Sequence, residues 1–163
     1  ETLIDELTKL YNRRRIKKMF ADLSPQSNSD LISCVFLLDI DNFKLYNDYW
    51  GHLQGDVCLS MISGALTKLA SFGIYAGRYG GEEFIILMPN TNNSFEKIEK
   101  VRELISNIEV NFEDITIDNI SMSFGIYNIT EDIVNEDVKS LRKKYIGNAD
   151  KALYTSKGNN KNK

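Results

Sequence analysis

The order of apolar and polar positions predicts helices and strands that take turns along the chain. A first helix begins after Asn12, a residue type that favours helix N-termini, and one face of it is apolar at helical spacing: Ile16, Met19, Phe20 and Leu23. Residues 31–40 form a nearly continuous apolar run, as expected of a central strand buried on both faces. The run ends in Asp39 and Asp41, so this strand brings carboxylates to the edge of a sheet, where sites form.

Two predicted helices follow this strand, and each of them ends at a glycine. The shorter helix covers residues 43–50 and ends at Gly51, and the longer one covers residues 53–72 and ends at Gly73. Glycine is common just after helices because it lacks a Cβ and adopts left-handed backbone angles without strain.

The next segment predicts a β-hairpin with two acids at its turn. Residues 74–76 and 84–88 are apolar and strand-like, and Gly80–Gly81 lies between them. A Gly-Gly pair in this place favours a tight turn in which both glycines take positive φ. Glu82 and Glu83 follow directly. A turn has no need of two carboxylates, whereas a metal or nucleotide site does; the alternative is a polar hairpin tip with solvated glutamates.

The rest of the chain predicts a helix at residues 95–108, strands at 115–117 and 121–129, and a closing helix at 138–157. The helix at 95–108 is strongly periodic and has one apolar stripe: Phe95, Ile98, Val101, Ile105 and Ile108. Helices that interleave with strands, together with one hairpin, predict an α/β fold. We expect a mixed central β-sheet with an antiparallel portion, flanked by helices.

Length and charge narrow the class of protein. The 163 residues suit one domain with a single core. A net charge of −3 without a long basic run argues against a protein that binds nucleic acid. The apolar runs are far shorter than the roughly 20 residues of a membrane span, so we expect no membrane contact by this domain. Because the chain begins at Glu1 rather than Met, we expect that it was excised from a longer protein.

The two cysteines indicate the compartment. Cys34 lies in the apolar strand and Cys58 lies on an apolar helix stripe, and no Cys/His spacing suggests zinc. Both are therefore expected to be buried thiols in a reducing, cytoplasmic environment.

Asp39 and Glu82 form the first candidate site. If the strand that ends at Asp39 lies beside the strand that follows Glu82, two carboxylates meet at one edge of the sheet. Such a pair binds Mg²⁺ well, because this ion takes oxygen ligands and is bound together with substrate phosphates. Two unrelated surface acids are the alternative, and spacing alone does not decide between them.

Asn47, His52 and Asp56 form the second candidate site, beside a helix start. An amide and a carboxylate together can read a guanine edge, since the carboxylate accepts hydrogen bonds from both N1–H and the exocyclic amine. A lone histidine is more often a structural hydrogen-bonding group than a catalyst. The P-loop and GxGxxG patterns are both absent, so a nucleotide site here is of another kind.

Three lysines could contact phosphates: Lys44, Lys157 and Lys161. Lysines beside a polar tail are usually solvated, but they also hold triphosphate oxygens as point charges.

Four short motifs follow one another in the chain. Residues 5–14 read DELTKLYNRR, residues 39–56 read DIDNFKLYNDYWGHLQGD, residues 80–84 read GGEEF, and residues 149–157 read ADKALYTSK. Together they resemble the GGDEF domain, the catalytic domain of diguanylate cyclases. That family has the motifs DxLTxLxNRR, DxDxFKxxND-x-x-GHxxGD, GGDEF or GGEEF, and ADxALYxAK. The resemblance extends to Lys161, so we expect residues 1–163 to be a single GGDEF domain.

The resemblance implies a role for each matching residue. It implies Mg²⁺, with Mn²⁺ as a substitute, held by four ligands: the side chains of Asp39, Glu82 and Glu83 and the carbonyl of Ile40. It implies that Glu82 also accepts the proton of the attacking 3′-hydroxyl. The implied substrate-binding residues are Asn47 and Asp56 at guanine, His52 near the substrate, and Lys44, Lys157 and Lys161 at the phosphates.

The implied activity is condensation of two GTP into the second messenger cyclic di-GMP, with release of two pyrophosphates. A homodimer would be required, since each half-site would hold one GTP. The fold would resemble the palm of nucleotide polymerases and class III nucleotidyl cyclases. A regulatory region would precede the domain, and the full-length protein could be tethered to a membrane. The alternatives are a GTP-binding sensor without turnover and a dimerisation module.

Two departures from the family pattern concern binding residues. The family usually has arginine at the position of Lys161, which keeps the charge but loses bidentate geometry. Many members also carry an RxxD product-inhibition site nine residues before the first signature glycine. Ser71 and Ile74 occupy those positions here, so that site is absent.

Overall fold

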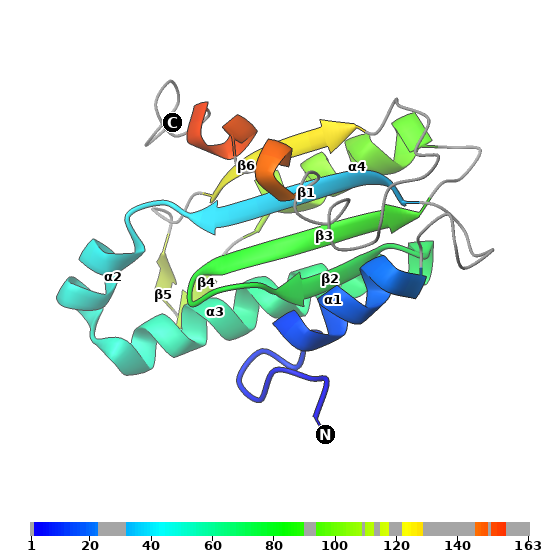
Figure 1. The fold of residues 1–163 in the computed structure, drawn as a ribbon. Helices are drawn as coiled ribbons and strands as arrows, with labels where there is room; N and C mark the ends of the chain where they lie inside the picture. The colour runs from blue at the N-terminus through cyan, green and yellow to red at the C-terminus, as the bar shows by residue number, and fades with distance from the viewer. Residues whose placement is uncertain are drawn as a thin grey trace.

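The computed structural model describes residues 2–22, 32–89, 94–108, 110–112, 115–117, 122–128, 146–149 and 151–155. The elements are α1 (Arg13–Asp22), β1 (Ile32–Ile40), α2 (Phe43–Trp50), α3 (His52–Thr67), the 3₁₀ helix η2 (Lys68–Phe72), β2 (Tyr75–Arg78), β3 (Glu83–Pro89), α4 (Ser94–Ser106), β4 (Val110–Phe112), β5 (Ile115–Ile117) and β6 (Met122–Asn128). Residues 146–149 and 151–155 are also helical. The order of elements is the predicted one, with β4 added (Figure 1).

The central sheet has the strand order β2-β3-β1-β6, and β4 and β5 pair separately. All neighbours in the central sheet are antiparallel. The α/β architecture with flanking helices is therefore confirmed, but the four strands do not form the mixed sheet that we expected. The parallel contact found among the described residues is one isolated bridge, between Tyr11 and Gly77.

The antiparallel pattern results from how the crossovers are interleaved. The helices α2 and α3 connect β1 to β2, and the segment that contains α4 connects β3 to β6. Each crossover joins strands that run in the same direction. However, β3 lies between β1 and β2, and β1 lies between β3 and β6. This split arrangement makes every adjacent pair antiparallel.

The strand β1 is buried on both faces, as predicted. Its alternate side chains enter two cores, which is what the period of two in a strand requires. Phe36 and Leu38 lie in the core that includes α3 and α4. Val35 and Leu37 lie in the core that includes α1 and the helical residues near the C-terminal end. In Figure 1, α1 and those C-terminal helical residues lie in front of the sheet, while α3 and α4 lie behind it.

Most predicted helix ends are confirmed. Asn12 Oδ1 accepts a hydrogen bond from the Arg15 N–H at 3.0 Å, so Asn12 caps α1. Gly51 and Gly73 have φ of 92° and 72°, in the left-handed region that glycine favours. The predicted helix at 53–72 begins as α3 and tightens into η2 for its last five residues. Such 3₁₀ turns are frequent at the C-terminal ends of helices.

The apolar stripe of α4 was predicted wrongly at its first residue. Val101 and Ile105 are buried, whereas Phe95 is 76% exposed. Phe95 belongs to the first turn of α4, beyond the part of the helix that contacts the core. Leu23 and most of the predicted helix at 138–157 lie outside the described residues.

The hairpin turn also differs from the prediction. Neither Gly80 nor Gly81 has positive φ, because the connection is a four-residue loop at 79–82 rather than a two-residue turn. The backbone N–H groups of Tyr79 and Gly80 both donate to the Glu83 carbonyl, at 2.8 and 3.2 Å. A Cβ at Gly80 would lie 2.8 Å from Glu83 Oε1, so a larger residue there would push the end of the Glu83 side chain aside.

Both cysteines are buried free thiols, as predicted. Burial raises the pKa of each thiol to about 12, so neither is a reactive thiolate near neutral pH. Over the described part of the chain, no helix has both the length and the apolar character needed to cross a bilayer.

Candidate active site

Residues predicted to bind metal are neighbours at one edge of the sheet, although Glu82, the predicted partner of Asp39, is not the residue opposite it. The strands β1 and β3 are neighbours, and Asp39 is paired directly with Glu83. The Ile40 N–H donates to the Glu82 carbonyl at 3.4 Å, which continues the ladder past the end of β3. The expectation that these two strands lie side by side is therefore confirmed.

The side chains of Asp39 and Glu83 lie on the same face, since directly opposite residues in an antiparallel pair point the same way. It is the face that α1 covers, because Val35 and Leu37 of the same strand pack there. Asp39 Oδ1 is shielded from solvent. Asp39 and Glu83 are both partly buried, so the sheet places two half-buried carboxylates side by side on this face.

This donor set fits a magnesium ion. Carboxylate and backbone carbonyl oxygens are the ligands that Mg²⁺ prefers, and the ion usually keeps several waters and substrate oxygens. Among the described residues, no three or more His, Cys, Asp or Glu side chains are grouped to hold a metal ion. Asp39, Glu82 and Glu83 therefore do not form a complete cage. Which of them bind the ion remains a prediction.

Asp41 is also part of this edge, as the end of the apolar run predicted, although it was not among the predicted metal ligands. It is 7% exposed, and its Oδ1 accepts a hydrogen bond from Ser123 Oγ at 2.6 Å. Ser123 is also the residue of β6 that pairs with Asp39. The end of β1 is thus fixed from both neighbouring strands. Ser123 is far from Asp41 in the sequence. The contact between them therefore could not be predicted without knowing that β6 pairs with β1.

The predicted base-binding residues lie where α2 meets α3. Gly51 alone connects these two helices, and its N–H donates to the Asn47 carbonyl at 2.8 Å. The side chain of Asn47 lies against Gly55, where any Cβ would overlap its Oδ1. Asn47 Oδ1 is buried and has no hydrogen-bond partner in the described part of the chain. Buried acceptors are normally satisfied, so this one is an exception at the junction of the two helices.

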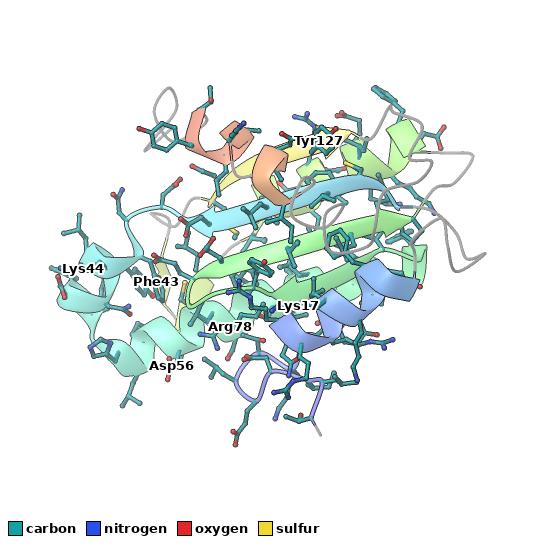
Figure 2. All side chains as sticks on the ribbon, viewed as in Figure 1. Lys17, Phe43, Lys44, Asp56, Arg78 and Tyr127 are labelled. Atoms are coloured by element: carbon teal, nitrogen blue, oxygen red, sulfur yellow. The ribbon has the colours of Figure 1, made fainter. Side chains whose placement is uncertain are left out.

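The other predicted substrate residues are on the surface. Lys44, His52 and Asp56 are exposed on α2 and α3. Figure 2 labels Lys44 and Asp56, which lie on the outside of this helix pair. Lys157 and Lys161 lie outside the described residues.

Arg78 links the N-terminal turn to the hairpin. Its Nη1 contacts Asp5 Oδ2 at 3.1 Å, and its Nη2 and Nε donate to the Gly81 carbonyl at 2.8 and 3.2 Å (Figure 2 labels Arg78). The Arg78 N–H donates to the Tyr11 carbonyl at 2.9 Å. The sequence places Arg78 just before the hairpin glycines but does not indicate that it fixes the loop. Its contacts in the structure do.

Asp5 is held as a carboxylate by its surroundings. Burial acts to raise its pKa, but hydrogen bonds from the Thr8 N–H and hydroxyl, at 2.9 and 2.7 Å, and the Arg78 guanidinium outweigh burial. The pKa of Asp5 is therefore lowered from its ordinary value of 3.8. The charge pair between Asp5 and Arg78 persists at neutral pH.

Known proteins resemble the chain over its full length. Diguanylate cyclase VdcA of Vibrio cholerae is 35% identical over all of this chain and 46% of its own length. Diguanylate cyclase DosC of Escherichia coli K12 is 31% identical over all of this chain and 35% of its own length. The chain thus spans less than half of these relatives.

Solved structures have the same fold. The GGDEF domain of DgcB from Caulobacter crescentus, solved in complex with c-di-GMP, superposes with a TM-score of 0.78. It is 28% identical, and the match covers 100% of this chain and 92% of that one. The diguanylate cyclase SiaD of Pseudomonas aeruginosa, solved with its activator SiaC, also gives 0.78, at 29% identity over 99% of this chain and 60% of that one.

The family model described as "Diguanylate cyclase, GGDEF domain" matches residues 2–163. The fold predicted from the resemblance agrees with these structures, and the four motifs stand in a chain that the family model covers almost completely. The chain belongs to the GGDEF domain family of diguanylate cyclases.

Proposed function

We propose that this domain is a diguanylate cyclase that condenses two GTP into cyclic di-GMP and releases two pyrophosphates. The observation that carries the proposal is the edge of the sheet. There Asp39 pairs with Glu83, Ile40 bonds to Glu82, and the α2–α3 corner with its unsatisfied Asn47 acceptor belongs to the same domain. Oxygen ligands and a buried base acceptor are what a metal-assisted nucleotidyl transfer to or from GTP requires.

The residues would divide the chemistry between them. Asp39, Glu82 and the Ile40 carbonyl would hold Mg²⁺ or Mn²⁺, with Glu83 beside them. When bound, the metal would supply Lewis acidity at the α-phosphate. Glu82 would accept the proton of the attacking 3′-hydroxyl, as a general base at the end of the hairpin loop.

The substrate residues would bind the two ends of GTP. Asn47 and Asp56 would bind the guanine edge, and His52 would lie near the substrate. The phosphates would be held by three lysines: Lys44, Lys157 and Lys161. Each copy would bind one GTP, so turnover would require two copies with their sites facing each other.

The deciding experiment is to incubate the purified chain with GTP and Mg²⁺, identify the nucleotide product, and measure pyrophosphate. Formation of cyclic di-GMP with two pyrophosphates supports the proposal. A GTP-binding sensor would show a raised melting temperature with GTP but no pyrophosphate. A dimerisation module would show neither effect. Saturation at 100 times the Kd stabilises a protein by about 2.7 kcal/mol, which a melting experiment resolves.

A further inference from the structure

The α2–α3 junction contains a polar pair that the predicted site does not include. Gln54 is 5% exposed, and its Nε2 donates to the Tyr46 hydroxyl oxygen at 3.1 Å. Both residues occupy unspecified positions of the motif in residues 39–56, so the family pattern assigns them no role. A partly buried hydrogen bond between two helices restricts how one helix can rotate against the other.

The pair lies directly beside the predicted base-binding contact. On α2, Tyr46 precedes Asn47, and on α3, Gln54 precedes Gly55. The junction therefore has two adjacent contacts, one between Tyr46 and Gln54 and one between Asn47 and Gly55. Only one residue links the two helices, so these contacts set their register. That register determines how Asn47 on α2 is placed relative to Asp56 on α3.

Two buried acceptors at the junction are unsatisfied. Gln54 Oε1 and Asn47 Oδ1 both lack a hydrogen-bond partner in the described part of the chain. An apolar residue at position 54 would fill the same space without burying an acceptor that lacks a hydrogen bond. Packing alone therefore does not account for a buried glutamine here. The amide that is present gives the junction a directional contact, which a leucine of similar size would lack.

The Tyr46 ring extends the contact toward the metal edge. It stacks on Phe43 with ring centroids 6.2 Å apart and an interplanar angle of 10°. Phe43 is the first residue of α2, and the preceding Asn42 has φ of 55°, so the chain turns sharply between the end of β1 and this ring. Burial raises the pKa of the Tyr46 phenol, and the Gln54 hydrogen bond acts in the opposite direction. The hydroxyl is therefore protonated in neutral solution.

We propose that Tyr46 and Gln54 are positioning residues for base selectivity: their hydrogen bond holds α2 and α3 in the register at which Asn47 and Asp56 reach one guanine. The inference rests on the proposed function, because it concerns the same nucleotide site. Neither residue touches the base. They act through the placement of the two residues that do.

The test compares nucleotide binding by two variants, Tyr46→Phe and Gln54→Leu, in the 163-residue chain. Affinities for GTP and ATP are measured by displacement of a fluorescent GTP analogue, and the melting temperature is recorded for each protein. The matched control is Ser63→Ala. Ser63 is a buried polar residue farther along α3, and its hydroxyl donates to the Leu59 carbonyl of the same helix at 2.6 Å.

The expected result is a loss of selectivity. Each variant should lower the GTP affinity by about three- to tenfold, as for loss of one hydrogen bond, while the ATP affinity changes less. The ratio of GTP affinity to ATP affinity should be unchanged in Ser63→Ala. The double variant Tyr46→Phe/Gln54→Leu should be no worse than the more affected single variant, since both remove the same contact.

Two different failures are distinguishable. If the unmutated chain prefers GTP and both variants keep that preference, the pair is merely structural and this inference is overturned, while the proposed function stands. If the unmutated chain shows no preference for GTP, the proposed function falls and the inference falls with it. If Gln54→Leu does not fold, Tyr46→Phe alone decides the test, because it keeps the ring and removes only the hydroxyl oxygen.

Discussion

At the scale of single residues, Glu82 has the most direct predicted role, as metal ligand and as proton acceptor. Glu82→Gln keeps the size of the side chain and removes its charge. We expect the fold and GTP binding to persist, and turnover to fall by at least the roughly 10²–10⁴-fold that a general base contributes. Pyrophosphate release and the GTP-induced melting shift measure the two effects.

The control for this substitution is Glu99→Gln, because Glu99 is an exposed acid of α4 that pairs with Arg102 of its own helix at 3.5 Å. It should leave turnover unchanged. Turnover of Glu82→Gln within a few-fold of the unmutated chain would contradict both roles of Glu82.

Gly55 and Gly64 offer a second residue-scale comparison on one helix. A Cβ at Gly55 would overlap Asn47 Oδ1, whereas a Cβ at Gly64 meets nothing within 4 Å. Gly64→Ala should stabilise α3 by about 0.5–1 kcal/mol, through helix propensity. Gly55→Ala should displace Asn47 and weaken GTP binding by about tenfold or more. Titration of GTP into both variants measures this. Equal GTP affinities in the two would show that Asn47 does not read the base.

Residue-scale features were predictable where a local rule governs them. Asn12 as an N-cap follows from its side chain and the helix that begins after it. The backbone of Gly80 and Gly81 was predicted wrongly, because a glycine pair signals a turn but not its length. The contact between Ser123 and Asp41 was not predictable, since it depends on how β6 pairs with β1.

At the scale of elements, Arg78 connects three segments: the N-terminal turn, the end of β2 and the hairpin loop. Arg78→Met should lower the free energy of unfolding by about 1–2 kcal/mol, since it removes a partly buried ion pair with Asp5 and two exposed hydrogen bonds to the Gly81 carbonyl. It should also lower turnover by loosening the loop that holds Glu82. Denaturant unfolding and initial rates measure the two effects.

The pH dependence supplies a further check on this link. The folded-state pKa of Asp5 is lowered, so its contribution to stability is present above its ordinary pKa of 3.8 and is lost as the pH falls through the folded-state value. In Arg78→Met, part of this loss of stability at low pH should disappear, because the guanidinium that lowers the pKa of Asp5 is gone. If Asp5→Asn costs as much stability with Met at position 78 as with Arg, the two side chains are not coupled.

The absence of the RxxD site is a local property of η2 and β2. Ser71 is exposed at the end of η2, and Ile74 is 1% exposed in the core just before β2. The guanidinium and carboxylate of that site are therefore missing, and so are their contacts with guanine and phosphate. We expect calorimetry with saturating GTP analogue to detect no tight binding of cyclic di-GMP. Tight, noncompetitive binding would contradict this expectation.

The elements themselves were largely predictable, but their pairing was only partly so. Long periodic segments such as α3, and the continuous apolar run of β1, have strong patterns. The strand β4 has three residues, too few for a period to appear. The wholly antiparallel pairing could not be inferred from alternating helices and strands, which are equally compatible with parallel neighbours. It depends on which strand is inserted between which, as β3 is between β1 and β2.

At the scale of the whole molecule, the proposed product imposes a condition on assembly. Cyclic di-GMP consists of two identical halves, so two GTP-loaded sites must meet, and the metal edge and base-binding residues of one copy supply only half of that arrangement. Product formation by the isolated domain should therefore rise more steeply than linearly with protein concentration. Initial rates over a wide concentration range test this, alongside the oligomeric state from light scattering.

A coiled coil fused before α1 should raise the specific activity at low concentration. Tethering converts the meeting of two copies into an intramolecular event with an effective concentration in the millimolar range, without any new contact at the site. The same fusion carrying Glu82→Gln is the control, because it dimerises equally but lacks the proposed base. If the unfused chain is monomeric and its specific activity does not depend on concentration, each copy completes the reaction alone, and the requirement for a dimer is wrong.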